Sequence, residues 1–223
     1  VNKVGGSLSK NDHWYLTQAF GLTGDPGAVP IGHTATGGVI SDYVSGSDVY
    51  RSHTFQNSDT FSVSAISSEY PGIDLLLVAG GGGGGGVGGP GNYTGGGAGA
   101  GSLHYKTSVP VSDSPGSYTI VIGAGGNGSK KSNESGTVGG NSTAFGYTAA
   151  GGGVGGTSGY SSGGPGGSGG GGGYGGNPGP GSGATGHPGG IDIASPPDAQ
   201  GWGNPGNYPG PAPGSQGDGS GGG

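Results

Sequence analysis

Residues 80–88 contain the spacing G-x-G-x-x-G, which in nucleotide-binding proteins holds a phosphate against the backbone. That chemistry needs a helix directly after the loop, because the helix amino terminus attracts the anion. No helical pattern follows these glycines, and 67 of the 223 residues are Gly, so the spacing arises by chance. We therefore expect no cofactor-binding residues and no cofactor.

The residue types used in metal binding and acid–base catalysis are dispersed along the chain. No histidines stand at the short spacings of metal ligands, and no carboxylates or nucleophiles form a catalytic constellation. The histidines are His13, His33, His53, His104 and His187. The sequence thus predicts no metal site, no catalytic residues and a protein that is not an enzyme.

Three ionisable residues fall inside predicted strands. His53 and His104 alternate with apolar residues, which predicts a solvated sheet face for both. Asp74 interrupts the most apolar strand, and a strand-end position among polar neighbours is the favoured interpretation. Capping of a backbone group and pairing with Arg51 are the alternatives.

Four asparagines have the N-x-[ST] spacing that accepts an N-linked sugar. They are Asn92, Asn127, Asn133 and Asn141. All lie in glycine-rich or turn-like sequence, where an acceptor would be exposed. Unmodified loop asparagines are the favoured interpretation, and glycosylation is the alternative.

Five aromatic residues lie in otherwise low-complexity sequence. They are Tyr93, Tyr160, Tyr174, Trp202 and Tyr208. Rigid rings on a Gly/Ser/Asn background are typical of recognition loops. These rings are candidates to contact a host-surface glycan or outer-membrane protein, and packing between glycine strands or between subunits is the other interpretation.

The composition excludes several classes of protein. Charged residues make up 8% of the chain and the net charge is −6, whereas nucleic-acid binding needs clustered cations. There is no Cys for disulfides or thiolate chemistry, and no apolar run approaches the ~20 residues of a membrane span. The high Gly content opposes helix formation, and a strict G-X-Y phase, which collagen requires, is absent.

By composition the chain has three zones: an amino-terminal arm at 1–33, a strand-rich region at 34–150, and a Gly/Pro-rich extension at 151–223. Strand patterns in the middle zone are separated by Pro and Gly. They cover residues 49–55, 60–65, 73–79, 103–111, 117–122 and 143–149. We predict an all-β fold resembling a short-strand sandwich or jelly roll, with the run at 73–79 as a central strand.

The arm contains one strand pattern, at residues 13–20. Trp14, Leu16 and Phe20 fall on one face of this strand, and Tyr15 lies between Trp14 and Leu16 in the sequence. Glycines then separate the segment from the rest of the chain. The segment either pairs with its own sheet or adds to the sheet of a neighbouring subunit. In the second case Trp14, Tyr15, Leu16 and Phe20 are the candidate self-assembly residues.

The glycine tracts follow the ends of predicted strands; the longest covers residues 80–86. Glycine can adopt an extended helix with three residues per turn, and unlike proline it keeps its N–H group. Side-chain-free segments of this kind can pack closely and hydrogen-bond laterally. The sequence therefore predicts ordered, polyglycine-II-like loops beside the β core.

Several stretches resemble the glycine-rich domain found in many phage and environmental viral tail proteins. They are residues 35–38, 50–55, 59–63, 77–79 with the following glycines, 115–126 and 140–146. The resemblance covers about residues 34–175 and implies a tail-fibre-like or cell-surface protein. The carboxy-terminal zone is similar in style to the polyglycine-II adhesin tips of T-even-type phages, without a matching motif.

These observations lead to a functional expectation. We expect a non-enzymatic, extracellular, self-assembling subunit of a virion fibre or surface fibril, whose main partner is itself. A tail-tip adhesin that uses the loop aromatic residues is the alternative. A third hypothesis, ice binding, would require regular rows of Thr or Ala at period three, and none is present.

Overall fold

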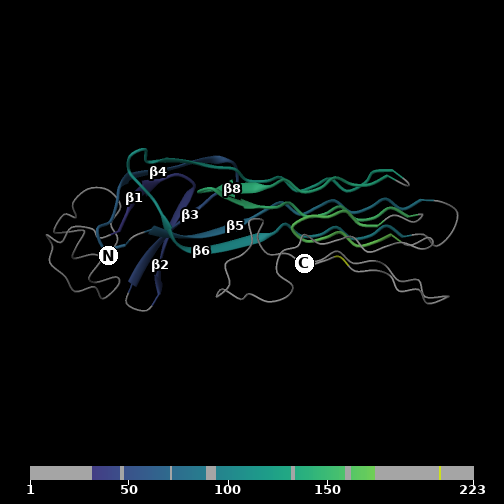
Figure 1. The fold of residues 1–223 in the computed structure, drawn as a ribbon, viewed down its shortest axis with the longest axis horizontal. Helices are drawn as coiled ribbons and strands as arrows, with labels where there is room; N and C mark the ends of the chain where they lie inside the picture. The colour runs from purple at the N-terminus through teal and green to yellow at the C-terminus, as the bar shows by residue number, and fades with distance from the viewer. Residues whose placement is uncertain are drawn as a thin grey trace. The chain divides into compact units, whose positions relative to one another are not determined.

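The structure is a computed structural model that describes residues 32–45, 48–70, 72–88, 94–131, 134–158, 162–173 and 206 (Figure 1). These residues contain nine strands and no helix. The strands are β1 (Thr34–Thr36), β2 (Val39–Ser45), β3 (Asp48–Thr54), β4 (Asp59–Ala65), β5 (Gly72–Val78), β6 (Leu103–Pro110), β7 (Ser117–Ile120), β8 (Ser142–Ala144) and β9 (Tyr147–Ala149).

The strands pair in antiparallel ladders. β4 lies in the middle of a three-stranded sheet with the order β1-β4-β7, while β2-β3, β5-β6 and β8-β9 form two-stranded sheets. The predicted all-β class is confirmed. The sandwich or jelly-roll arrangement stays a prediction, because the described ladders do not establish it.

Packing divides the described chain into two compact units. Unit 1 comprises the described residues up to Asp74 together with Thr107–Ile120, and unit 2 comprises Leu75–Lys106 together with the described residues from Val121 onward. The boundary falls inside β5 and β6. The three zones of the sequence were defined by composition, so these units neither test nor replace them.

The core of unit 1 forms around the central strand β4. Phe61 and Val63 on this strand are buried, together with Ala35 of β1 and Ile120 of β7. Between β1 and β2 the chain turns at Gly37 and Gly38, which have φ values of 111° and 63°. These values lie in a region that residues with a Cβ rarely adopt, so the corner depends on glycine.

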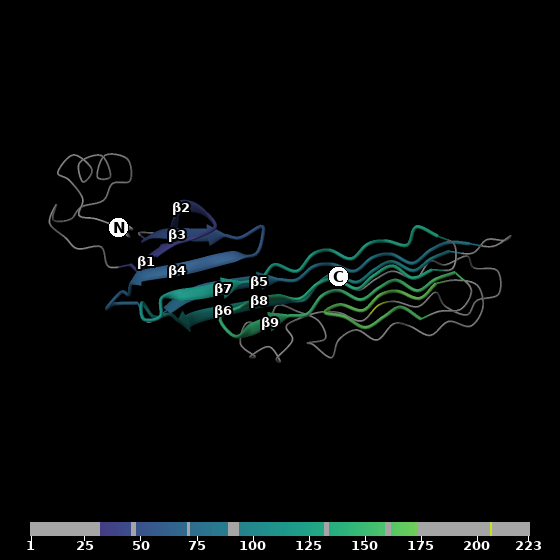
Figure 2. The same cartoon turned by 90° about the horizontal axis from the view of Figure 1, so that it is seen from above.

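Unit 2 contains extended glycine-rich segments that run side by side (Figure 2). Residues 79–88 form the central segment of this glycine bundle. The amides of Gly82 and Gly85 donate to the carbonyl oxygens of Gly99 and Gly96, at 2.9 and 3.1 Å. Partners on one neighbouring segment thus recur every third residue, as expected for three residues per turn.

The next residue in each turn bonds to a different neighbour. The amides of Gly83 and Gly86 donate to the carbonyl oxygens of Thr137 and Glu134, at 2.9 and 3.0 Å. The carbonyl oxygens of the same two glycines accept hydrogen bonds from residues in 150–158. The central segment is therefore bonded on several sides, which a β-strand, with partners on two sides only, does not achieve.

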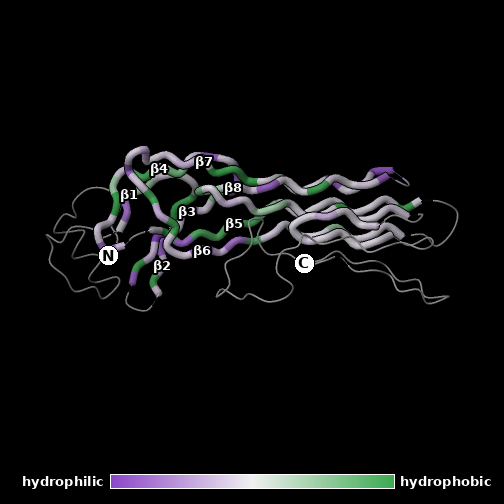
Figure 3. Tube along the Cα trace, in the orientation of Figure 1, coloured by the Kyte–Doolittle hydropathy of each residue, from purple (hydrophilic) through white to green (hydrophobic). Residues whose placement is uncertain are grey.

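Side chains in the glycine bundle occur only where the backbone leaves room. Figure 3 shows these segments as largely neutral in hydropathy, in contrast to the alternating strands. An added Cβ at Gly82 would overlap the carbonyl oxygen of Gly153, and one at Gly83 would overlap that of Asn127. At Gly84 the nearest atom would be 3.8 Å away. Two residues in each turn of the central segment therefore have to be glycine.

The prediction of a central strand at 73–79 is wrong among the described residues. β5 pairs only with β6, and its side chains alternate. Leu75 and Leu77 are buried, whereas Leu76 is 63% exposed and Val78 is 51% exposed. The apolar run therefore does not reflect burial on both faces.

Two other strand predictions need correction. The pattern at 143–149 predicts one strand, but β8 and β9 form a hairpin with a turn at Phe145 and Gly146, which have φ values of 52° and 82°. β2 was not predicted at all. Its apolar residues lie on both faces, so it lacks the alternation that identified the other strands.

Candidate interaction surface

Among the described residues of unit 1, most of the exposed large apolar side chains lie on the β2–β3 hairpin. All seven residues of β2 are exposed. Five large apolar side chains of the hairpin are at least 43% exposed: Val39, Ile40, Tyr43, Val44 and Tyr50. Because a two-stranded hairpin alone is marginally stable in water, such a surface is typical of a site that contacts a partner.

The register assigns these side chains to two faces. Val39, Ser41 and Tyr43 lie opposite Thr54, Ser52 and Tyr50 on one face, which we call the tyrosine face. On this face the rings of Tyr43 and Tyr50 stack, with centroids 5.3 Å apart and planes 15° apart. The Oγ atoms of Ser41 and Ser52 lie 2.8 Å apart.

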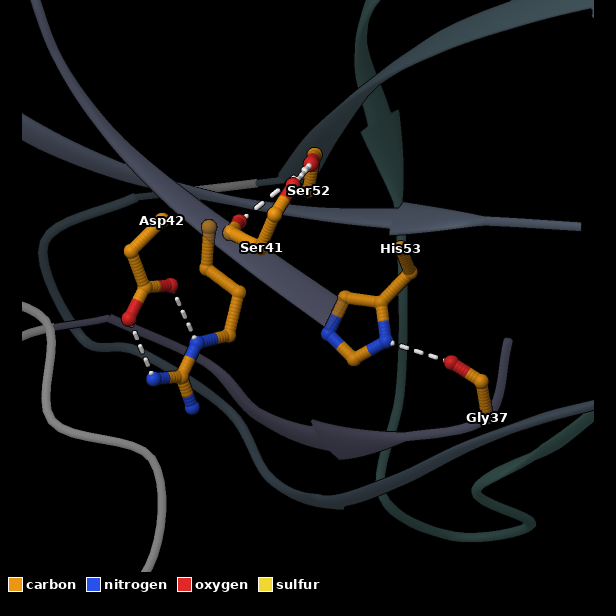
Figure 4. Close-up of polar contacts among 6 residues, drawn as sticks. Gly37, Ser41, Asp42, Ser52 and His53 are labelled. Atoms are coloured by element: carbon orange, nitrogen blue, oxygen red, sulfur yellow. Dashed lines mark hydrogen bonds and ion pairs between the residues drawn. The ribbon is translucent and has the colours of Figure 1, made fainter. Parts of the chain in front are cut away.

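The opposite face carries an ion pair. Arg51 donates from Nε to Oδ1 of Asp42 at 2.6 Å and from Nη2 to Oδ2 at 2.7 Å (Figure 4). This two-pronged geometry is the strong form of the Arg–carboxylate interaction. The hydrogen bonds from Arg51 lower the pKa of Asp42 below its ordinary value of 3.8 and raise that of Arg51.

The ion pair makes hairpin stability depend on pH. Because the folded-state pKa of Asp42 is lowered, its contribution is complete above the ordinary value of 3.8 and is lost as pH falls through the folded pKa. For this exposed pair we expect about 0.2–1 kcal/mol. Amide exchange of residues 39–54 should therefore differ between wild type and Asp42→Asn at neutral pH. The difference should disappear well below the ordinary pKa, and a constant difference would contradict this assignment.

His53 anchors the base of the hairpin. Its Nδ1 lies 2.8 Å from the carbonyl oxygen of Gly37, a contact drawn as a dashed line in Figure 4. Its ring meets the ring of Phe61 edge-on. Both histidines were predicted to lie on a solvated sheet face, but His53 is half-buried and the prediction for His104 is wrong. His104 is 1% exposed, and its Nε2 lies 2.8 Å from the carbonyl oxygen of Thr148.

Asp74 caps a backbone group, which was one of the alternatives for this residue. Its Oδ1 accepts a hydrogen bond from the amide of Ser108 at 3.2 Å. Ser108 has a positive φ of 53°, an uncommon conformation for a residue with a side chain. Arg51 instead pairs with Asp42, so the proposed Asp74–Arg51 pair does not form.

Two candidate glycosylation sites lie in the described part of the chain, and both are exposed. The amide of Asn127 donates to Oγ1 of Thr137. The side-chain Oδ1 of Asn141 accepts a hydrogen bond from the amide of Gly151 at 2.9 Å. Asn141 therefore supports the glycine bundle, and its modification stays a prediction.

The other predicted site residues lie outside the described residues. These are the self-assembly candidates Trp14, Tyr15, Leu16 and Phe20, the aromatic candidates Tyr93, Tyr160, Tyr174, Trp202 and Tyr208, and the asparagines Asn92 and Asn133. Within the described part, no group of three or more His, Asp or Glu residues could hold a metal ion. That part also contains no helix long and apolar enough to cross a membrane.

Several segments of the glycine bundle end at the same end of the bundle. Segments 121–131 and 150–158 both run parallel to the central segment 79–88, as their hydrogen bonds to it show. Gly88 and Ser158 lie in contact there, since the amide of Gly88 donates to Oγ of Ser158 at 2.8 Å. The carboxy-terminal ends of the three segments therefore share one end of the bundle.

Comparison with known proteins identifies one family. Residues 56–223 match the glycine-rich domain family, which is more than half of the chain. No curated protein and no solved structure shows significant similarity. The alternation of β-strands with laterally bonded glycine segments is thus accompanied by a sequence match over the same region, and the chain belongs to the glycine-rich domain family.

Proposed function

We propose that this protein is a non-enzymatic, self-assembling structural subunit of an extracellular fibre, either a virion fibre or a cell-surface fibril. The main support is the glycine bundle, whose segments are held by backbone hydrogen bonds on several sides. Such an element is stiff and offers few side chains for chemistry, which suits a spacer or rod. The resemblance to tail-fibre-like and surface proteins favours the same interpretation.

The proposed route of assembly is strand addition through residues 13–20. Purified protein should form long polymers in negative-stain electron microscopy, and deletion of residues 1–20 should abolish them. Trp14→Ser with Phe20→Ser should act like the deletion, because it removes the apolar face. Thr17→Ala, on the other face of the same segment, is the control. Fibres that persist after the deletion would refute this route.

A receptor-binding adhesin is the second candidate, and the shared end of the bundle favours it. Tyr93 and Tyr160 follow segments 79–88 and 150–158 within five residues in the sequence. Tyr174 follows residues 168–173, which run parallel to 150–158 because the amides of Gly153 and Gly156 donate to the carbonyl oxygens of Ser168 and Gly171. Residues that leave a rigid support at one end are well placed to present a recognition surface. If the protein is an adhesin, the purified protein should form compact particles that bind host cells. Tyr174→Ala should reduce this binding without preventing assembly.

A further inference from the structure

The sequence of β2 lacks the residues and the irregularities by which exposed sheet edges are normally protected. Native edge strands are short, carry Lys or Pro, or contain a bulge. β1, β7, β8 and β9 have three or four residues, and β6 contains Lys106 and Pro110. β2 has seven residues, Val-Ile-Ser-Asp-Tyr-Val-Ser, in continuous register with β3. Among the described residues, β3 is its only ladder partner.

The charge on β2 does not protect this edge either. Asp42 is the only charged residue of the strand, and Arg51 of the same hairpin neutralises it through two hydrogen bonds. A second strand can therefore approach the edge without a net charge opposing it. The occupant has to match the side chains on the two faces of β2.

Tyr43 indicates which occupant fits. One face of its ring stacks on Tyr50, and the residue is 53% exposed. Neighbouring strands lie about 4.7–4.9 Å apart, a spacing at which aromatic rings on adjacent strands stack. A strand with tyrosine opposite Tyr43 would extend the stack, and a second copy of β2 supplies that tyrosine.

We infer that the outer edge of β2 pairs with the outer edge of β2 from a second copy of this chain, antiparallel and about a two-fold axis at Tyr43. The two hairpins then form one four-stranded sheet with a row of four stacked tyrosines. Each residue pairs reciprocally across such an axis, as in other isologous interfaces. With the axis at Tyr43, residues 41–45 of the two edges lie opposite each other, and the backbone groups of alternate residues pair across the interface.

The two-fold axis at Tyr43 also suits the neighbouring residues. Asp42 of each copy lies opposite Val44 of the other, so the carboxylates do not face each other. Ser41 lies opposite Ser45, and both are small and polar. An axis at Asp42 would instead place like charges directly opposite, which destabilises a sheet.

This inference rests on the proposed self-assembling function and names one of its contacts. The full chain should associate reversibly in sedimentation velocity experiments, and Tyr43→Lys should weaken the association at least tenfold by placing two lysines at the axis. Tyr43→Phe keeps the ring and should associate like wild type. Tyr70→Lys changes another exposed tyrosine of unit 1, at 45% exposure, and is the matched control.

Two further measurements do not depend on loss of association. A mixture of Tyr43→Lys and Tyr43→Glu proteins should form heterodimers more readily than either variant associates with itself. The chain contains no Cys, so Tyr43→Cys should give a covalent dimer under mild oxidation, because Cβ atoms of opposite residues lie about 4.5–5.5 Å apart. Tyr70→Cys should not.

These experiments distinguish a failure of the β2 edge pairing from a failure of the proposed self-assembling function. If wild type polymerises and Tyr43→Lys does so equally, the edge pairing is refuted while the self-assembling function stands. If association is lost only on deletion of residues 1–20 and Tyr43→Cys gives no disulfide, the arm occupies the edge and the inference fails. Wild type that remains monomeric at every concentration refutes both.

Discussion

Gly85→Ala should unfold the glycine bundle, whereas Gly84→Ala at the adjacent position should leave it intact. A Cβ atom on residue 85 would overlap the carbonyl oxygen of Gly156. Backbone bonded to its neighbours cannot move aside, so we expect a loss at or above the usual ~1–3 kcal/mol of overpacking. On residue 84 the Cβ would lie 3.8 Å from the carbonyl oxygen of Gly96, an ordinary contact. There the reduced freedom of the unfolded chain should give about 0.4–1 kcal/mol of stabilisation.

The neighbouring pair repeats this comparison one turn earlier. Gly82→Ala meets the carbonyl oxygen of Gly153, and Gly81→Ala has its nearest atom 3.8 Å away, on Gly99. Hydrogen exchange of the amides in 79–102, followed by mass spectrometry, measures the effect directly. Equal protection in all four variants would show that the segments do not bond with period three.

Lateral bonding of the glycine tracts was predictable from the sequence, but their partners were not. A tract such as 80–86 keeps every N–H group and has no side chain to prevent close approach. The same absence of side chains removes any pattern that would distinguish one neighbour or register from another. The partners, such as Thr137 for Gly83, follow from where the adjoining strands begin and end.

Errors in the strand predictions have separate physical causes. An apolar run usually indicates burial on both faces, yet Leu76 and Val78 are exposed in β5. Phe145 has a positive φ, which is rare for an aromatic residue, so alternation alone could not reveal the turn. In β5 one face stays exposed among the described residues, and between β8 and β9 a backbone turn interrupts the alternation.

The candidate surface could be found only in part from the sequence. The strand pattern at 49–55 includes Arg51 and His53, but nothing in the sequence links Asp42 to Arg51, because β2 has no strand alternation. Its apolar residues, Val39, Ile40, Tyr43 and Val44, occupy both faces of the hairpin, so no period-two pattern arises. All seven residues of β2 are exposed, with apolar side chains on both faces, and this exposure makes β2 the leading candidate for self-association.

Phe61→Ala should be the most destabilising large-to-small substitution in unit 1. Phe61 is 5% exposed on the central strand β4, and its ring packs near those of His53, Phe55 and Tyr118, at centroid distances of 5.1, 6.3 and 6.4 Å. Removing a buried phenylalanine typically costs about 3–5 kcal/mol, through lost burial and the cavity that remains. Without the Phe61 ring, the His53 side chain loses its edge-on contact, so the base of the β2–β3 hairpin should also become less stable.

Hydrogen exchange distinguishes this local effect from general unfolding. In Phe61→Ala, the amides of β1, β4 and β7 should exchange faster, while those of Gly83 and Gly99 in unit 2 should keep their protection. Tyr70→Ala, which removes an aromatic ring that is 45% exposed, should change little, because little burial is lost. Loss of protection in both units would mean that they unfold together, so that the sheet around Phe61 supports the glycine bundle as well as the hairpin.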